Sequence, residues 1–147
     1  MKLLALNIRQ GGGTRIDSIC SYLIAQDCDA IVISEFRRNT PGDQLIKALR
    51  RAGFSHIHHN NTDSKQNTVM LATKQASTLL KIDGCSNEWS LIGISWAGLQ
   101  LVGTYFPQRK DKAGVFNTLE TIASSDLLAI GDFNTGSNVL DSECAKF

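Results

Sequence analysis

The sequence predicts a layered α/β fold, and three observations support this prediction. In the first third of the chain, short apolar runs alternate with segments whose apolar residues recur at helical spacing. The middle of the chain changes to short β-prone segments separated by turn-like residues. A last helical segment then leads into one more apolar run. Strands that alternate with helices and then give way to hairpins are typical of sheets covered by helices.

The first strand is expected over residues 2–8, and the glycines at 11–13 then form a turn in which positive φ has no steric cost. Thr14 is the expected N-cap of the following helix, with Asp17 three positions on. A second buried strand is expected at 30–33. This region therefore begins with a strand, a glycine turn, an amphipathic helix and a strand.

The second helix repeats the capping pattern. Thr40 is the expected cap, Pro41 stands at the first helical position, and Gly53 ends the helix. Short strands follow, which we interpret as an antiparallel meander; they are expected at 54–58, 68–73, 78–82, 89–96 and 99–106. A third helix, marked by apolar residues from Val115 to Ala123, leads into a final buried strand at 127–130.

Composition limits the class of protein. The chain has 147 residues, of which 42% are apolar and 20% charged, as in an ordinary globular domain. Its 15 basic and 14 acidic residues leave a net charge of +1, so charge alone does not indicate a nucleic-acid partner. The four cysteines form no C-x-x-C pair, and the apolar run 3–6 is too short for a signal peptide or a membrane span. We expect a cytoplasmic protein with reduced thiols and no membrane partner.

Polar side chains follow the final strand directly. Asp132 and Asn134 are two residues apart, so an extended backbone places them on one face while Phe133 turns to the other. Gly131 and Gly136 bracket the pair and allow a sharp turn close to a ligand. The carboxyl ends of strands in open α/β sheets are where ligands collect. An ordinary Asx turn is the alternative interpretation of the pair.

Three other strand ends also present polar groups, namely Asn7, Glu35 and Tyr105. A buried carboxylate is costly unless it is paired or holds a cation, so Glu35 and Asp132 on one edge favour a divalent metal. Oxygen ligands suit Mg²⁺ or Mn²⁺ rather than Zn²⁺. The alternatives are a Glu35 ion pair with a nearby arginine, a turn role for Asn7 and a half-buried strand position for Tyr105.

The same loops are rich in basic residues; these are Arg9, Arg37, Arg38, Arg109, Lys110 and Lys112. A cation beside carboxylates, with arginine and lysine around it, is the arrangement that phosphoryl chemistry requires. We therefore expect a phosphate or nucleic-acid rim that includes Arg9, Arg37 and Arg109. Ordinary solvated charges are the alternative for any one of them. The three histidines, His56, His58 and His59, fall on both faces of one predicted strand and do not suggest a joint metal site.

Four motifs occur in register with these elements: Leu-Ala-Leu-Asn-Ile at 4–8, Ile-Ser-Glu at 33–35, Gly-Thr-Tyr-Phe-Pro-Gln at 103–108 and Gly-Asp-Phe-Asn at 131–134. In this order they resemble the endonuclease/exonuclease/phosphatase superfamily with the DNase I-like fold, and the exonuclease III branch in particular. The resemblance implies a layered sandwich of mixed β-sheets with outer helices. It also implies Mg²⁺ (or Mn²⁺)-dependent hydrolysis of a phosphodiester by in-line attack.

The resemblance also implies roles for individual residues. Asn7 and Glu35 would form the metal site. Tyr105 would contact the scissile phosphate, Asp132 would orient or activate the attacking water, and Asn134 would hold a phosphate oxygen. DNA, or another phosphodiester, is then the expected partner, and the protein is expected to be a nuclease.

The likeness runs from about residue 2 to residue 136. Members of the superfamily continue with further strands that carry an Asp and then an Asp-His pair, and nothing in residues 137–147 matches them. We therefore expect residues 1–147 to be a single, C-terminally incomplete domain whose second sheet is largely missing, with self-association as a way to cover the exposed sheet face. Two alternative functions stay open: a catalytically inactive fragment or binding module, and a phosphoesterase for a small-molecule or lipid phosphoester.

Overall fold

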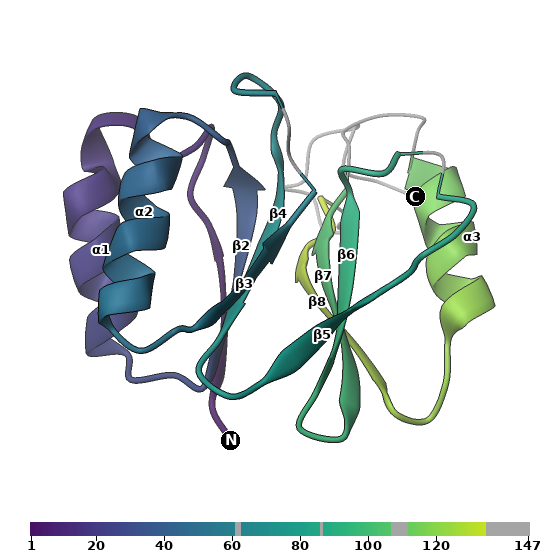
Figure 1. Cartoon of the computed structure of the whole chain (residues 1–147). Coiled ribbons are helices and arrows are strands. Elements are labelled where there is room, and N and C mark those ends of the chain that lie inside the picture. The colour runs from purple at the N-terminus through teal and green to yellow at the C-terminus, as the bar shows by residue number, and fades with distance from the viewer. Residues whose placement is uncertain (61–62, 86, 107–111, 135–147) are drawn as a thin grey trace, which may run out of the picture.

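The fold has four layers, with helices outside and two sheets face to face between them (Figure 1). The structure is a computed structural model of the chain and describes residues 1–60, 63–85, 87–106 and 112–134. The elements of the first half are β1 (Leu3–Asn7), α1 (Ile16–Ala25), β2 (Ala30–Phe36), α2 (Thr40–Arg51), β3 (His56–His59) and β4 (Thr68–Thr73). Those of the second half are β5 (Ser77–Leu80), β6 (Leu91–Trp96), β7 (Leu99–Tyr105), α3 (Lys112–Ile122) and β8 (Leu127–Asp132).

In the part of the chain that the structure describes, each sheet has four strands and mixes parallel with antiparallel pairs. The first sheet has the order β1-β2-β4-β3, in which β1 and β2 are parallel and the other pairs antiparallel. The second has the order β5-β6-β7-β8, in which only β7 and β8 are parallel. Because β1 runs with β2 and β7 runs with β8, the carboxyl ends of each pair lie at the same edge.

Apolar side chains fill the three spaces between the four layers. Residues of β2, β4, β6 and β7 form the core between the sheets; the buried ones include Val32, Val69, Leu71, Ile94 and Leu101. The outer face of the first sheet packs on α1 and α2, where Leu23, Leu45 and Leu49 are fully buried. The outer face of the second sheet packs on α3 through Val115 and Phe106. Both sheets are therefore packed on both faces, although β1 is only half-buried and Leu128 of β8 is 39% exposed.

This architecture confirms the layered α/β fold and corrects two details of the sequence prediction. The second sheet is not largely missing, because β5, β6, β7 and β8 form it. The first sheet has no uncovered face, because the second sheet packs on it. The expected meander divides between the sheets: β3 and β4 join the first sheet, and β5, β6 and β7 join the second.

Local signals at the helix ends were partly right. The glycine turn has positive φ at Gly11, Gly12 and Gly13, as expected. Thr14 is not the N-cap of α1, because it lies inside a short 3-10 helix, Gly13–Arg15, that precedes α1. Arg15 occupies the N-cap position of α1, and its side chain forms no capping hydrogen bond. In α2 the cap is Asn39, whose side chain accepts from the Gly42 amide, and Thr40 is already helical.

Among the described residues, Cys20, Cys28 and Cys85 are free thiols, and Cys144 lies outside them. No helix in the described part of the chain is long and apolar enough to cross a membrane. The cytoplasmic location stays a prediction.

Candidate active site

Four strand ends meet at one edge of the sandwich and bring together polar residues from distant parts of the sequence. Asn7 is the last residue of β1, Asp132 the last of β8 and Tyr105 the last of β7. Glu35 lies near the end of β2. In the parallel pairs, Asn7 is in register with Ser34, and Tyr105 with Asp132. The topology thus gathers the residues that the sequence placed at strand ends.

The Asn7 side chain joins the two carboxylates. Its Nδ2 donates to Glu35 Oε1 at 2.9 Å and to Asp132 Oδ2 at 2.6 Å. Its Oδ1 accepts from the Arg9 backbone N–H at 2.8 Å, which fixes the orientation of the amide. One amide group therefore holds a carboxylate from each sheet in a part-buried position.

Glu35 stands on a backbone that favours glycine. The register of β2 on β4 shifts between Ser34 and Phe36, which leaves Glu35 as an extra residue with φ of +58°. Its Oε2 accepts from the Gln10 N–H at 2.8 Å and from Asn67 Nδ2 at 3.2 Å. Such a conformation costs about 1–3 kcal/mol and persists only when surrounding contacts hold it, as is common at functional sites.

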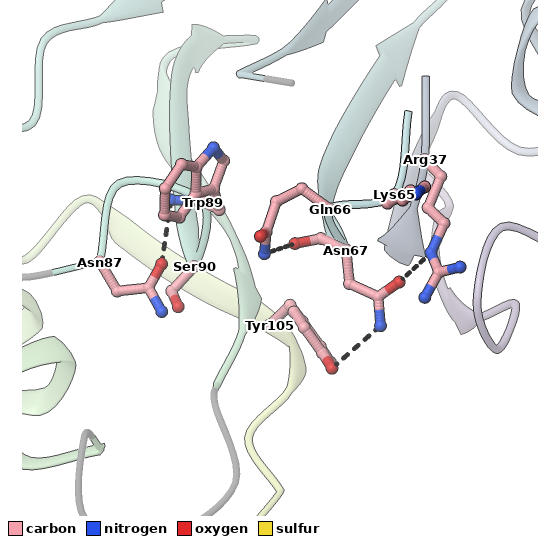
Figure 2. A pocket seen from close by; sticks show the side chains of 8 residues that line it. All are labelled: Arg37, Lys65, Gln66, Asn67, Asn87, Trp89, Ser90 and Tyr105. Atoms are coloured by element: carbon pink, nitrogen blue, oxygen red, sulfur yellow. Dashed lines mark hydrogen bonds between the residues drawn. The ribbon is translucent and has the colours of Figure 1, made fainter. Parts of the chain in front are cut away.

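Asn67 belongs to this site, although the sequence analysis did not identify it. Its Nδ2 lies 3.3 Å from the Tyr105 hydroxyl, in addition to its bond to Glu35 (Figure 2). Its Oδ1 accepts from Arg37 Nε at 2.5 Å. In the sequence, the feature that could have identified Asn67 is its position directly before an apolar run. That run forms β4, which is antiparallel to β2 and so begins at the edge where β2 ends.

Tyr105 keeps its phenolic proton while its oxygen accepts from Asn67 Nδ2. Burial raises the pKa of its phenol above the ordinary value of 10.0, and the Glu35 and Asp132 carboxylates raise this pKa further. The Asn67 hydrogen bond and the Arg37 charge lower the pKa, but the net shift is upward. The hydroxyl therefore remains protonated at neutral pH.

Asp132 and Asn134 are fixed by a turn after β8. The backbone N–H of Asn134 donates to Asp132 Oδ1 at 2.9 Å, and Asn134 has φ of +48°. One hydrogen of the Asn134 amide is used by the Phe106 carbonyl at 2.7 Å, and Lys112 Nζ donates to the Asn134 carbonyl. Both residues are therefore near the edge, but the Asn134 side chain contacts the backbone directly after β7, and only its backbone N–H reaches a carboxylate.

The basic residues of the expected rim differ in their surroundings. Arg9 is exposed and lines a cavity of about 530 Å³ that Glu35 and the glycine turn also line. Arg37 reaches the site through Asn67. Arg38 instead pairs with Asp43 at 2.8 Å on α2. The expected rim residue Arg109, and Lys110, lie outside the described residues.

The donor set fits a hard divalent cation. Within the described part of the chain, no ion pair reaches Glu35 or Asp132, so two adjacent carboxylates share only amide donors. Their oxygens are ligands of the kind that Mg²⁺ prefers, whereas Asn7 turns its Nδ2 to them and its Oδ1 to the Arg9 N–H. Among the described residues there is no group of three or more His, Cys, Asp or Glu side chains placed to hold a metal. The candidate ligands in this arrangement are therefore the two carboxylates.

Known proteins match this chain through their structures. No protein-family profile matches the sequence, and no curated protein matches it either. Among solved structures, an AP endonuclease from Archaeoglobus fulgidus matches with a TM-score of 0.72 and 16% identity, over 99% of this chain and 64% of its own. The 3'-5' exonuclease NExo from Neisseria meningitidis matches with a TM-score of 0.68 and 15% identity, over 92% and 58% respectively.

The chain has the DNase I-like fold. The resemblance of its four motifs to the endonuclease/exonuclease/phosphatase superfamily is thereby confirmed for the fold. ANGEL2, a 2',3'-cyclic phosphatase, also shares this fold, with a TM-score of 0.61 and 15% identity over 82% of this chain and 43% of its own. The chain spans less than two thirds of the length of each of these three proteins.

Proposed function

We propose that the edge formed by Asn7, Glu35, Tyr105 and Asp132 hydrolyses phosphodiesters with the help of Mg²⁺ or Mn²⁺, and that its substrate is DNA. The observation that carries the proposal is the single Asn7 amide that joins Glu35 to Asp132. The fold supports it, because structural neighbours include an AP endonuclease and a 3'-5' exonuclease. Hydrolysis of a phosphoester is the function that these contacts support best.

Glu35 and Asn7 are the residues that would hold the metal, with Asp132 beside them. Asn7 would do so through its Oδ1, which requires its amide to turn from the arrangement in which Nδ2 faces the carboxylates. A divalent cation bound there supplies charge that polarises a phosphate oxygen and stabilises the transition state. Glu35 is suited to the task because its backbone and both of its oxygens are already fixed. A ligand that is preorganised in this way loses little conformational freedom on binding.

The remaining residues act on the phosphate and the water. The protonated Tyr105 hydroxyl donates to an oxygen of the scissile phosphate. Asp132 orients the attacking water and accepts its proton. The second amide hydrogen of Asn134 holds a phosphate oxygen, while Arg9 and Arg37 bind neighbouring phosphates. Arg109 is proposed for the same rim from the sequence alone.

The alternatives from the sequence become outcomes of the test. A small-molecule or lipid phosphoester would use the same metal and Tyr105. This alternative is supported by ANGEL2, a 2',3'-cyclic phosphatase of the same fold. A catalytically inactive module would keep the fold and show no metal-dependent turnover. That residues 1–147 are a single, C-terminally incomplete domain stays a prediction.

The proposal is tested by measuring Mg²⁺-dependent cleavage of plasmid DNA and of a duplex with one abasic site. We expect the wild-type chain to cleave DNA, and Glu35→Gln to lower the rate by about 10²–10³, since it removes a ligand charge but keeps the size of the side chain. Glu120→Gln, an exposed position on α3, is the matched control and is expected to retain the full rate.

Background-level cleavage by wild type and Glu35→Gln alike would contradict the enzyme proposal for this chain. Turnover of a chromogenic phosphomonoester without cleavage of DNA would transfer the proposal to small substrates. Circular dichroism of each variant separates loss of chemistry from loss of folding.

A further inference from the structure

A second cavity lies beside the carboxylate site and has a different chemical character. Its volume is about 390 Å³, which lies within the range of ligand pockets. The residues that line it come from four parts of the chain; they are Arg37, Lys65, Gln66, Asn67, Asn87, Trp89, Ser90 and Tyr105. In Figure 2, Trp89 stands at one side and Arg37 and Lys65 at the other, with Asn67 and Tyr105 between them.

The charge of the lining is positive. Among the described residues, the cavity is lined by two cations, Arg37 and Lys65, and by no carboxylate. Neither cation forms an ion pair with another described residue, whereas Arg38, next to Arg37 in the sequence, is paired with Asp43. Two cations without a protein counter-charge beside a polar cavity favour an anionic ligand.

The position of Trp89 is fixed by its backbone. Thr68 Oγ1 donates to the Trp89 carbonyl at 3.0 Å, and Tyr105 N–H donates to the Ser90 carbonyl at 2.8 Å. Asn87 Oδ1 accepts from the backbone N–H of Trp89 at 3.2 Å. Thr68 follows Asn67 directly, so this turn is attached to both residues that connect the cavity to the carboxylates. The backbone that carries the half-buried indole is therefore tied to the residues on either side of the site.

An indole, two cations and several amide groups are the features that recognise a nucleotide. The aromatic face stacks on a base, the cations bind phosphate, and the side-chain amides of Gln66 and Asn87 suit base edges. A base inside a duplex is already stacked between its neighbours, so only an unpaired or extruded base can reach an indole in a cavity.

We propose that this cavity is a subsite for one unpaired nucleotide of a nucleic-acid strand, with its base on Trp89 and its phosphate at Arg37 and Lys65. Asn67 and Tyr105 connect the subsite to the carboxylates, so the bound nucleotide lies next to the phosphodiester that is cleaved. The placement of the nucleotide next to the cleaved phosphodiester rests on the proposed function. The nucleotide subsite itself does not depend on it. It makes the substrate a strand with accessible bases and not a small phosphoester.

The test uses tryptophan fluorescence without metal, in the presence of a chelator, so that binding is measured and no cleavage occurs. The chain has two tryptophans, and Trp96 is only 2% exposed, so its emission is a constant background. The probes are a short single-stranded DNA, the same sequence as RNA, and a strand of equal length and charge that lacks all bases.

We expect a strand with bases to quench Trp89 emission and the baseless strand to leave it unchanged. A larger effect of the DNA or of the RNA identifies which of the two is preferred. Trp89→Ala is expected to abolish the quenching and to weaken binding of the labelled strand about fivefold or more, since stacking on an aromatic side chain contributes to affinity base by base. Tyr22→Ala, an exposed aromatic on α1, is the matched control and retains both the quenching and the affinity.

Equal binding of the strands with and without bases, or unchanged affinity of Trp89→Ala, would overturn the subsite. The result is independent of hydrolysis. Quenching in a chain that cleaves no phosphodiester would keep the subsite and remove the proposed chemistry, whereas cleavage without quenching would do the reverse.

Discussion

Asp132→Asn is expected to lower kcat for phosphodiester hydrolysis by about 10²–10⁴, the usual contribution of a positioned acid-base group. The substitution keeps the size of the side chain but removes the charge. It also leaves one oxygen where two now accept, from Asn7 Nδ2 at 2.6 Å and from the Asn134 N–H at 2.9 Å. Both the proton acceptor and its alignment are therefore lost. Steady-state kinetics at saturating substrate measure the effect.

Asp126→Asn is the matched control, because Asp126 is an exposed carboxylate in the turn before the same strand. We expect its kcat to stay within a factor of two of wild type, since surface substitutions of this kind have small effects. An equal loss in both variants would show that general charge is responsible, and an Asp132→Asn variant with wild-type kcat would remove Asp132 from the chemistry.

Gly131→Ala is expected to reduce the free energy of unfolding by about 2–6 kcal/mol, as the sum of backbone strain and overpacking. Gly131 has φ of +146°, and a Cβ at this position would lie 2.1 Å from the Thr104 carbonyl oxygen of the neighbouring strand β7. The β7 and β8 strands must then separate at the residue before Asp132. Urea unfolding followed by circular dichroism gives the free energy.

Gly84→Ala separates the two causes of this loss. Gly84 has φ of +78°, but an added Cβ there meets nothing within 4 Å. We expect it to show the strain alone, about 1–2 kcal/mol. If Gly84→Ala and Gly131→Ala are destabilised equally, the close approach of β7 and β8 is not the reason why residue 131 requires glycine.

Strand ends were the part of the site that the sequence could predict. Asn7, Glu35 and Asp132 each follow an apolar run, and parallel pairing of β1 with β2 brings such ends together. Their mutual hydrogen bonds could not be predicted, because Glu35 reaches Asn7 through an extra residue in β2 with positive φ. Glutamate has no intrinsic preference for a backbone with positive φ, so the surrounding contacts impose this conformation on Glu35.

Asn67 shows why a search limited to the ends of strands was incomplete. It precedes β4, and an antiparallel strand begins at the edge where its neighbour ends. The direction of β4 was not available from its sequence. For the same reason the expected meander could not be assigned to two sheets: alternation describes which face of a strand is buried but not which strand it pairs with.

The central claim is that Asn7, Glu35 and Asp132 form one site for a divalent cation, and titration with Mn²⁺ monitored by electron paramagnetic resonance tests it most directly. We expect the wild-type chain to bind Mn²⁺ and Mg²⁺ to compete for the same site. Glu35→Gln and Asp132→Asn are each expected to weaken Mn²⁺ binding about tenfold or more, and Asp43→Asn on α2 to leave it unchanged. Identical Mn²⁺ affinity in the wild type and in both site variants would contradict the account.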